Sequence, residues 1–105
     1  MNNFREMRGY HQATDDDGVV VSPSYSPRYV YYENHGAVYL IPKEDVGNIR
    51  LEDGRLSREL FDKIDISSAF KSDERNVQLP AETLNRIRSD LTKGYAALGL
   101  HCVFK

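Results

Sequence analysis

The sequence predicts a single α+β domain, residues 1–105, with a mainly antiparallel sheet of about five or six short strands and its helices packed on one face. Three observations lead to this fold class. Short β-branched and aromatic runs alternate with tight-turn signals along most of the chain. Residues 80–98 carry apolar side chains at helical spacing, and residues 57–64 show a shorter helical pattern. Only the end of the chain offers the long crossover that joins parallel strands in a β-α-β unit.

The first 17 residues are expected to be a loosely held terminus. Phe4, Met7 and Tyr10 stand at i, i+3 and i+6, so one or two helical turns are the alternative.

Residues 15–18, with the sequence DDDG, invite comparison with a calcium-binding loop. With Gly18 at the sixth position of an EF-hand, Ala13 occupies the first position and Ser24 the twelfth, where acidic ligands are needed. The segment is therefore predicted to be a solvated turn, followed by a strand at 19–21 and a turn-rich connector at 22–27.

Residues 28–42 predict the central hairpin and contain four of the seven tyrosines. A three-residue loop with glycine last predicts a turn at residues 34–36 and pairs Tyr31 with Tyr39. In this register Val30, Tyr32, Val38 and Leu40 share one face, which we expect to be buried. The other face carries Tyr29, Tyr31, Tyr39, Ile41 and Glu33. A two-residue turn at residues 35 and 36 would shift the register by one and mix the two sets.

After the hairpin, residues 42–47 are expected to form a turn and residues 48–52 a strand, followed by a two-residue hairpin turn at Asp53 and Gly54. Ser57 is a good N-cap, and Leu56 stands where it could pack on Phe61, so a short helix is predicted at about 57–64.

The best helical pattern begins at Pro80, because proline suits a first helical turn. Residues 76–79 alternate as a strand before it, and Gly99 ends it. Its apolar face is formed by Leu84, Ile87, Leu91, Tyr95 and Leu98. A final strand is expected at 100–104, with Leu100, Cys102 and Phe104 pointing inward.

Size and composition limit the functional classes. The chain is long enough for one core, and the N-terminal residues lack the apolar run of a signal peptide, so a cytoplasmic location is expected. The net charge is −2, with −4 in residues 1–54 and +2 in residues 55–105. This balance disfavours a general nucleic-acid binder and permits docking on a basic partner.

No cofactor and no metal site is expected from the sequence. The possible ligands His11, His35, His101 and Cys102 are scattered, and adjacent strand residues point to opposite faces. Cys102 is expected to pack as a small apolar side chain rather than to act as a nucleophile.

The segment Val77-Gln78-Leu79-Pro80-Ala81-Glu82-Thr83-Leu84 resembles the strand-to-helix entry of ribbon-helix-helix repressors. The resemblance implies DNA contacts from Asn76 and Gln78. That family has a second helix after the first, whereas a strand is expected here, so Pro80 is interpreted as ordinary helix initiation. A nucleic-acid-binding regulator using residues 76–93, with Arg86 and Lys93 on the solvent face of the helix, remains one alternative function.

A second alternative is a small metal-independent ribonuclease-like hydrolase. General acid-base chemistry would use His35 with Glu33, Tyr31 and Arg28, provided that the fold brings these groups within hydrogen-bond reach. A histidine at the tip of a turn is more often a solvated turn residue, so a non-catalytic protein is preferred.

The leading hypothesis is a small inhibitor or immunity-type protein that neutralises a basic protein partner, such as a nuclease or a nucleic-acid-binding effector. Tyrosines give large contact area at low entropic cost, and carboxylates steer a basic surface. The expected partner-binding residues are Tyr29, Tyr31, Glu33, Tyr39, Glu44, Asp45, Asp15, Asp16 and Asp17.

Overall fold

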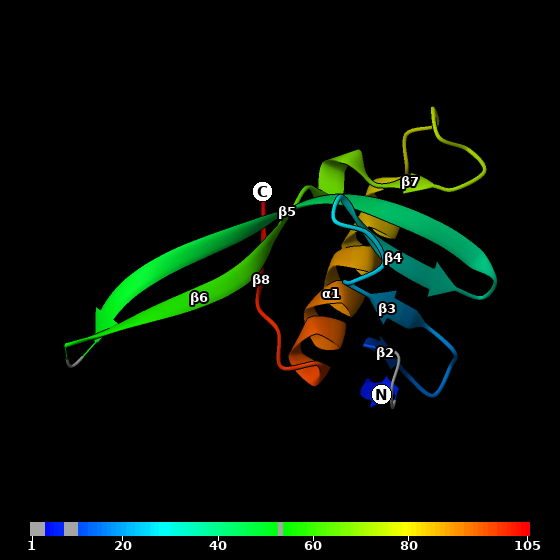
Figure 1. The fold of residues 1–105 in the computed structure, drawn as a ribbon. Coiled ribbons are helices and arrows are strands. Elements are labelled where there is room, and N and C mark those ends of the chain that lie inside the picture. Colours follow the sequence, from blue (N-terminus) through cyan, green and yellow to red (C-terminus); the bar gives the residue numbers. More distant parts are fainter. Residues whose placement is uncertain (1–3, 8–10, 53) are drawn as a thin grey trace.

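A curled sheet packs one face on a single α-helix, α1 (Ala81–Ala97), in the computed structural model of the chain (Figure 1). The structure describes residues 4–7, 11–52 and 54–105, and for residues 7, 47–52 and 55–60 it describes the backbone alone. The mixed α+β class predicted from the sequence is confirmed. Instead of five or six strands and two helices, the described residues form eight strands, α1 and one short 3-10 turn, η1 (Ile66–Ser68).

The sheet has the strand order β1-β2-β3-β4-β5-β6-β8, and β7 pairs with β5 beyond the end of β6. All pairs are antiparallel except β6 with β8, which are parallel. The helix forms the crossover before β8, so a β-α-β unit ends the chain, but its first strand is β6 rather than the strand expected at 76–79. The strands are β1 (Arg5–Met7), β2 (Gln12–Thr14), β3 (Val20–Ser22), β4 (Tyr29–Asn34), β5 (Ala37–Glu52), β6 (Arg55–Ile64), β7 (Phe70–Lys71) and β8 (Cys102–Phe104).

The turn between β4 and β5 contains two residues, His35 and Gly36, with φ of 49° and 82°. Two successive positive φ angles are typical of the type I′ turn, whose twist matches that of the flanking strands. Tyr32 therefore pairs with Tyr39 and Tyr31 with Leu40. The register built on a three-residue loop is wrong by one residue, and the alternative with the two-residue turn is the one adopted.

This shift changes which side chains face the helix. Tyr32 and Tyr39 are buried with Val30 and Ile41, whereas Leu40 lies on the opposite face with Tyr31. The predicted face of Tyr29, Tyr31 and Tyr39 therefore does not exist as one surface.

Strand β5 continues through residues 42–47, where a turn was expected, and β6 occupies the expected helix at 57–64. The pairing runs without a break from Glu52 with Arg55 to Lys43 with Ile64. A helix of eight residues is marginal by itself, whereas a long hairpin satisfies the same backbone groups with cross-strand hydrogen bonds. Gly54 has a φ of 75°, in agreement with the predicted turn, and its partner Asp53 lies outside the described residues.

Beyond its pairing with β4, β5 forms with β6 a two-stranded arm that extends away from the body of the molecule (Figure 1). The principal extents of 49, 29 and 22 Å reflect this elongated shape.

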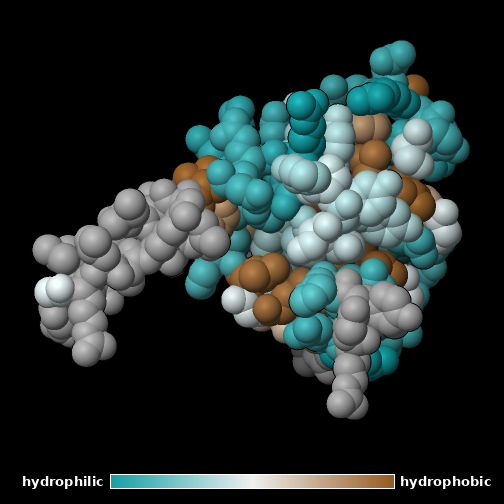
Figure 2. Space-filling view, in the orientation of Figure 1, coloured by the Kyte–Doolittle hydropathy of each residue, from teal (hydrophilic) through white to brown (hydrophobic). Residues whose placement is uncertain are grey.

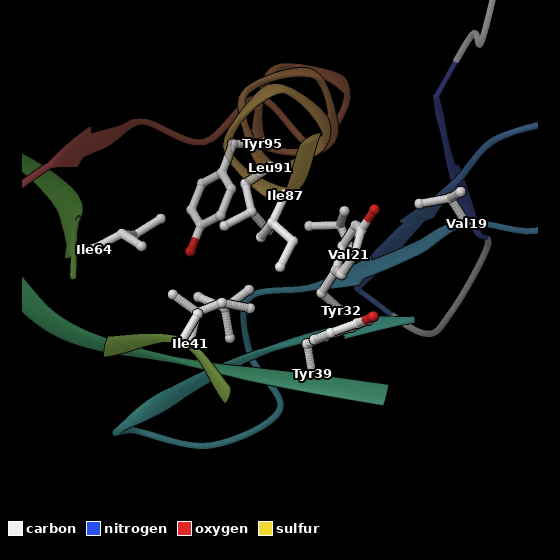
Figure 3. Close-up of a cluster of buried hydrophobic side chains, with 11 residues drawn as sticks. Val19, Val21, Tyr32, Tyr39, Ile41, Ile64, Ile87, Leu91 and Tyr95 are labelled. Atoms are coloured by element: carbon white, nitrogen blue, oxygen red, sulfur yellow. The ribbon is translucent and has the colours of Figure 1, made fainter. Parts of the chain in front are cut away.

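Helix α1 confirms the clearest local prediction. Pro80 is the N-cap residue rather than the first helical residue, and Gly99 follows the helix with a φ of 68°. Ile87, Leu91 and Tyr95 are buried on the predicted apolar face. Figure 3 shows these three side chains directed toward the sheet.

The core lies between α1 and the inner face of the sheet, and it includes two tyrosine rings. Tyr32 and Tyr39 pack with their ring centroids 5.8 Å apart. Tyr32 is fully buried because its hydroxyl has polar partners: it donates to Asp90 at 2.5 Å and accepts from the Asn34 side chain at 3.2 Å. The hydrogen bonds among Asn34, Tyr32 and Asp90 therefore connect β4 to the middle of α1.

Other local predictions differ from the structure. Residues 5–7 form a strand rather than a helical turn. Residues 12–14, part of the terminus that was expected to be loosely held, form a strand of the sheet. Tyr10 lies outside the described residues. Residues 76–79 do not form a strand, and Val77 is 53% exposed. In the last segment Cys102 and Phe104 are half-buried as expected, whereas Leu100 precedes β8 and is exposed.

Candidate functional site

The sheet face turned away from α1, called the outer face below, carries the aromatic residues of the hairpin that are not in the core. Among the described residues α1 is the only α-helix, and it lies on the other face. Strand alternation places Tyr29, Tyr31 and Glu33 of β4 on the outer face, and all three are half-buried. The space-filling view in Figure 2 shows a mostly hydrophilic surface with small, separated hydrophobic areas.

A groove of about 420 Å³ crosses the outer face over β2, β3 and β4, and we call it the tyrosine groove. Tyr25, from the connector after β3, stacks on Tyr31 with ring centroids 5.2 Å apart. The Tyr31 hydroxyl donates to Glu33 Oε1 at 2.6 Å. The groove therefore combines an aromatic wall with a carboxylate, and its lining residues are Gln12, Val20, Ser22, Tyr25, Tyr31 and Glu33.

The bond to Glu33 also keeps Tyr31 protonated. The phenol would lose this hydrogen bond on ionisation and would then face the Glu33 carboxylate, which raises the pKa of Tyr31 to about 12. At neutral pH Tyr31 therefore holds Glu33 in a fixed orientation beside the aromatic pair.

The acidic triplet lies at the same end of the sheet, since the turn between β2 and β3 is adjacent to the end of β4 where Val20 pairs with Glu33. Asp16 and Asp17 are exposed, and Asp16 forms an ion pair of 2.7 Å with Arg5.

Asp15 is buried and has a structural role. Its Oδ1 accepts hydrogen bonds from the backbone N–H groups of Asp17 and Val19, at 3.0 and 2.8 Å. These bonds form the turn expected at residues 15–18, and they remove Asp15 from the surface that a partner could contact.

The remaining predicted residues lie elsewhere. Glu44 is exposed on β5 at the opposite end of the outer face, and Asp45 faces the helix side of the sheet. Tyr39 is only 8% exposed and belongs to the core. Of the nine residues predicted to bind a partner, the structure brings together Tyr31, Glu33, Asp16 and Asp17.

Tyr29 lies at the Glu44 end of the outer face, where the two residues line a common pocket, and it belongs to a separate aromatic cluster. Its ring meets Phe70 edge to face with centroids 5.9 Å apart, and its hydroxyl accepts a hydrogen bond from Arg75 at 3.3 Å. The Arg75 guanidinium also lies 5.1 Å from the centre of the Phe70 ring. Tyr29 is thus partly covered by the loop that follows β7.

The residues of the hydrolase alternative are not assembled. His35 is exposed at the turn, and Arg28 precedes the other end of β4. At about 3.3 Å per strand residue, Glu33 and Arg28 are roughly 16 Å apart along the chain. Only Tyr31 and Glu33 of that set are in contact.

The nucleic-acid-binding hypothesis required a strand at residues 76–79. Asn76 and Gln78 instead lie in an exposed irregular segment. Arg86 and Lys93 are exposed on α1 as expected.

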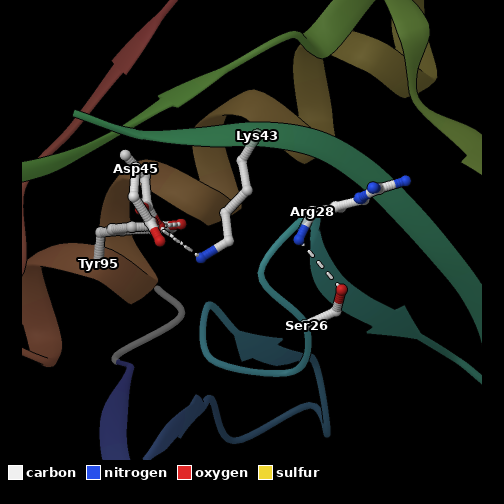
Figure 4. Close-up of polar contacts among 6 residues, drawn as sticks. Ser26, Arg28, Lys43, Asp45 and Tyr95 are labelled. Atoms are coloured by element: carbon white, nitrogen blue, oxygen red, sulfur yellow. Dashed lines mark hydrogen bonds and ion pairs between the residues drawn. The ribbon is translucent and has the colours of Figure 1, made fainter.

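A second cluster, made of charged and polar side chains, lies at the base of the arm (Figure 4). It was not predicted from the sequence. Lys43 Nζ lies 3.3 Å from Asp62 Oδ2 and 3.5 Å from Asp45 Oδ1, and the Tyr95 hydroxyl donates to Asp62 at 2.5 Å. Asp45 and Asp62 are cross-strand partners, and they interact directly. Asp45 and Asp62 are 17 residues apart in the sequence, so their contact can be predicted only when the pairing of β5 with β6 is known.

Burial raises the pKa of Asp62, and its hydrogen bond to Asp45 adds to this effect. The same hydrogen bond lowers the pKa of Asp45, whose side chain is 67% exposed. When the pair carries a single proton, that proton is therefore favoured on the buried Asp62 and the charge on the exposed Asp45.

Within the described ranges, no group of three or more histidine, cysteine, aspartate or glutamate side chains is arranged to hold a metal ion. In the same part of the chain, no helix has the length and apolar character required to cross a membrane. Comparison of the chain with models of known families, with curated proteins and with solved structures gives no match.

Proposed function

We propose that this protein is a small non-catalytic binding module of the inhibitor type, whose tyrosine groove receives a basic side chain of a protein partner. A nuclease or another nucleic-acid-binding effector is the kind of partner that would present such a side chain. The observation that supports this proposal most directly is the stacked pair Tyr25 and Tyr31 beside the oriented carboxylate of Glu33.

A lysine or arginine side chain fits this groove for two physical reasons. The faces of aromatic rings attract cations, by about 0.5–1 kcal/mol at exposed sites and more when water is excluded. The Glu33 carboxylate adds a charge-assisted hydrogen bond, which is stronger than a neutral one. Because Tyr31 already donates to Glu33, the carboxylate is fixed before the partner arrives, and less entropy is lost on binding.

The charges around the groove favour a basic protein over a nucleic acid. Glu33 and the exposed Asp17 lie at the same end of the sheet, where they would repel phosphate groups, whereas Asp16 is paired with Arg5. The same carboxylates would accelerate the approach of a basic surface. Val38 and Leu40, which pair with Glu33 and Tyr31, are half-buried on the same face and offer contact area next to the groove.

The proposal is tested by affinity capture from an extract of the source cells, with nuclease added to remove bridging nucleic acid. Captured proteins are identified by mass spectrometry, and the dissociation constant of each purified candidate is measured by calorimetry. We expect a basic protein, and we expect Tyr31→Ala to weaken its binding by about 2 kcal/mol, or roughly 30-fold.

Glu33→Gln should also weaken binding, and its effect should shrink at high salt. Glu82→Gln serves as the matched control, since Glu82 is exposed in the first turn of α1 and its substitution removes the same charge. If Tyr31→Ala and Glu33→Gln bind the partner as tightly as Glu82→Gln, the tyrosine groove is not the binding site. If a parallel capture without added nuclease retains only nucleic acid, the proposed class of partner is wrong.

A further inference from the structure

The cluster at the base of the arm forms the floor of a cavity of about 580 Å³. The cavity lies between the connector that precedes β4, the start of the arm and the C-terminal end of α1. Its walls include Pro23, Pro27, Phe61 and Leu100, and its polar side includes Lys43, Asp45, Asp62, Tyr95 and His101. Apolar walls around a few convergent polar groups are typical of small-molecule sites, which commonly occupy about 300–1,000 Å³.

The floor of the cavity is formed by side chains that contact one another and are largely buried. The Lys43 side chain is only 6% exposed and that of Asp62 only 13%, and they lie against one another and against Tyr95. Asp45 differs, because its side chain is 67% exposed and reaches the open part of the cavity. An entering molecule would therefore meet the Asp45 carboxylate first, with Asp62 behind it.

The electrostatics of this floor favour a positive charge. Two carboxylates face one ammonium group, so the cluster carries a net charge of −1 when both aspartates are ionised. The C-terminal end of α1 adds the negative end of a helix dipole, since Tyr95 lies in its last turn. The rings of Phe61 and Tyr95 line the same cavity and can attract a cation through their faces.

We propose that this cavity binds a small organic cation, with an ammonium, amidinium or guanidinium group on Asp45 and an apolar body against Phe61 and Leu100. The site is separate from the tyrosine groove, and its existence does not depend on the proposed protein partner. Binding places a second positive charge beside the carboxylate pair, which favours the form in which both aspartates are ionised. Where Asp62 is protonated before binding, its proton passes to the buffer as the cation binds.

The proton release gives the site a defined pH dependence. A higher pH ionises Asp62 before binding, so the affinity for the cation rises with pH until Asp62 is fully ionised. The ionisable groups of the described residues that face Asp62 are Lys43 and Asp45 on β5, Tyr95 on α1, Cys102 on β8 and His101 just before it.

Three probes of one size test the charge preference: benzamidine, which is cationic, benzyl alcohol, which is neutral, and benzoate, which is anionic. Each is titrated into the isotopically labelled protein and followed by amide NMR. We expect saturable shifts for benzamidine at Tyr95 and His101, with a dissociation constant on the order of 1 mM. Benzyl alcohol should bind at least about 10-fold more weakly, and benzoate should not saturate.

Asp45→Asn should weaken benzamidine binding about 10-fold and should leave the fold intact, because Asp45 is largely exposed. Asp73→Asn is the matched control, since Asp73 is exposed in the loop after β7 and makes the same change of charge. Calorimetry in two buffers of different ionisation enthalpy then measures the proton release of the unmodified protein, with affinity increasing as the pH rises.

Several results would overturn the proposal. These are benzamidine shifts confined to Tyr25 and Tyr31, equal binding of benzyl alcohol, undiminished binding to the Asp45→Asn protein, and affinity that falls as the pH rises. The first of these would assign benzamidine to the tyrosine groove and would leave the function proposed for that groove unaffected.

Discussion

Gly94 is the position at which the packing of α1 on the sheet can be tested most directly. An alanine Cβ at this position would lie 2.7, 2.8 and 2.9 Å from Cβ, Cγ2 and Cγ1 of Val21. Carbon atoms normally pack at about 3.5–4.0 Å, so helix and strand would have to separate by roughly 1 Å. A change of the Val21 rotamer cannot relieve the clash, because the nearest atom is Cβ and the side chain is fully buried.

The expected magnitude follows from two opposing terms. Overpacking of a core costs about 1–3 kcal/mol, whereas replacing glycine by alanine within a helix recovers about 0.8–1.0 kcal/mol. Since three contacts are too short, we expect Gly94→Ala to lower the free energy of unfolding by about 1–2 kcal/mol. This corresponds to a fall in Tm of roughly 4–16 °C for a domain of this size.

Urea unfolding measures the effect, with an unchanged m-value showing that the unfolded state is not altered. Ser89 provides the control: it is exposed on the same helix, so the difference between Ser89→Gly and Ser89→Ala measures helix propensity alone. In a Val21→Ala background, which removes Cγ1 and Cγ2 but keeps Cβ, the cost of the Gly94→Ala change should become smaller without disappearing. If Gly94→Ala is as favourable as alanine over glycine at position 89, the close approach of α1 to β3 is refuted.

Three further predictions concern polar groups and one concerns a turn. Tyr95→Phe removes the donor to Asp62 and should cost about 1–3 kcal/mol; because that hydrogen bond lowers the pKa of Asp62, carboxyl NMR titration should show this pKa rising further. Gly36→Ala should destabilise the protein by about 1–2 kcal/mol in urea unfolding, because φ at Gly36 is 82°. Burial raises the pKa of Cys102 to about 11, so its alkylation by iodoacetamide at pH 8 should be about 100-fold slower than that of free cysteine, and equal rates would contradict this burial. Since the pKa of Tyr31 is raised to about 12 in the folded state, the stability that its hydroxyl contributes is present below pH 10 and is lost as the pH rises toward 12; the stability difference from Tyr31→Phe should shrink over that range.

The sequence predicted those parts of the fold that depend on interactions within one element. Pro80, the apolar spacing through Ile87 and Leu91, and Gly99 together specify α1, because each acts over a few residues of one helix. The turn at Gly54 was predicted for the same reason, since a two-residue hairpin is a local preference.

The arm shows where local reasoning fails. Residues 57–64 carry a helix cap and an apolar pattern, yet they form β6 because β5 supplies an uninterrupted partner strand. That partner is known only when residues 42–47 are recognised as strand rather than turn. The turn wrongly predicted at 42–47 removed the partner strand of residues 57–64, and the helix wrongly predicted at 57–64 removed the partner strand of residues 42–47.

The candidate site was predicted in part, for a related reason. Tyr31 and Glu33 stand two residues apart on one strand, so their common face follows from the sequence in either register. Tyr39 was assigned to the same face because the turn was taken to contain three residues. A change of one residue in the loop moves a whole strand to the opposite face, which placed Tyr39 in the core.

What the sequence alone determined is therefore the class of the fold, its main helix, the turns at residues 15–18 and at Gly54, and the common face of Tyr31 and Glu33. Only the tertiary structure decided the hairpin register, the stacking of Tyr25 on Tyr31, and the meeting of Lys43, Asp45, Asp62 and Tyr95. The physical reason is that helix propensity and turn geometry act within a few residues. Strand pairing, in contrast, is chosen by contacts between segments distant in the chain, such as Tyr95 and Asp62, which are 33 residues apart.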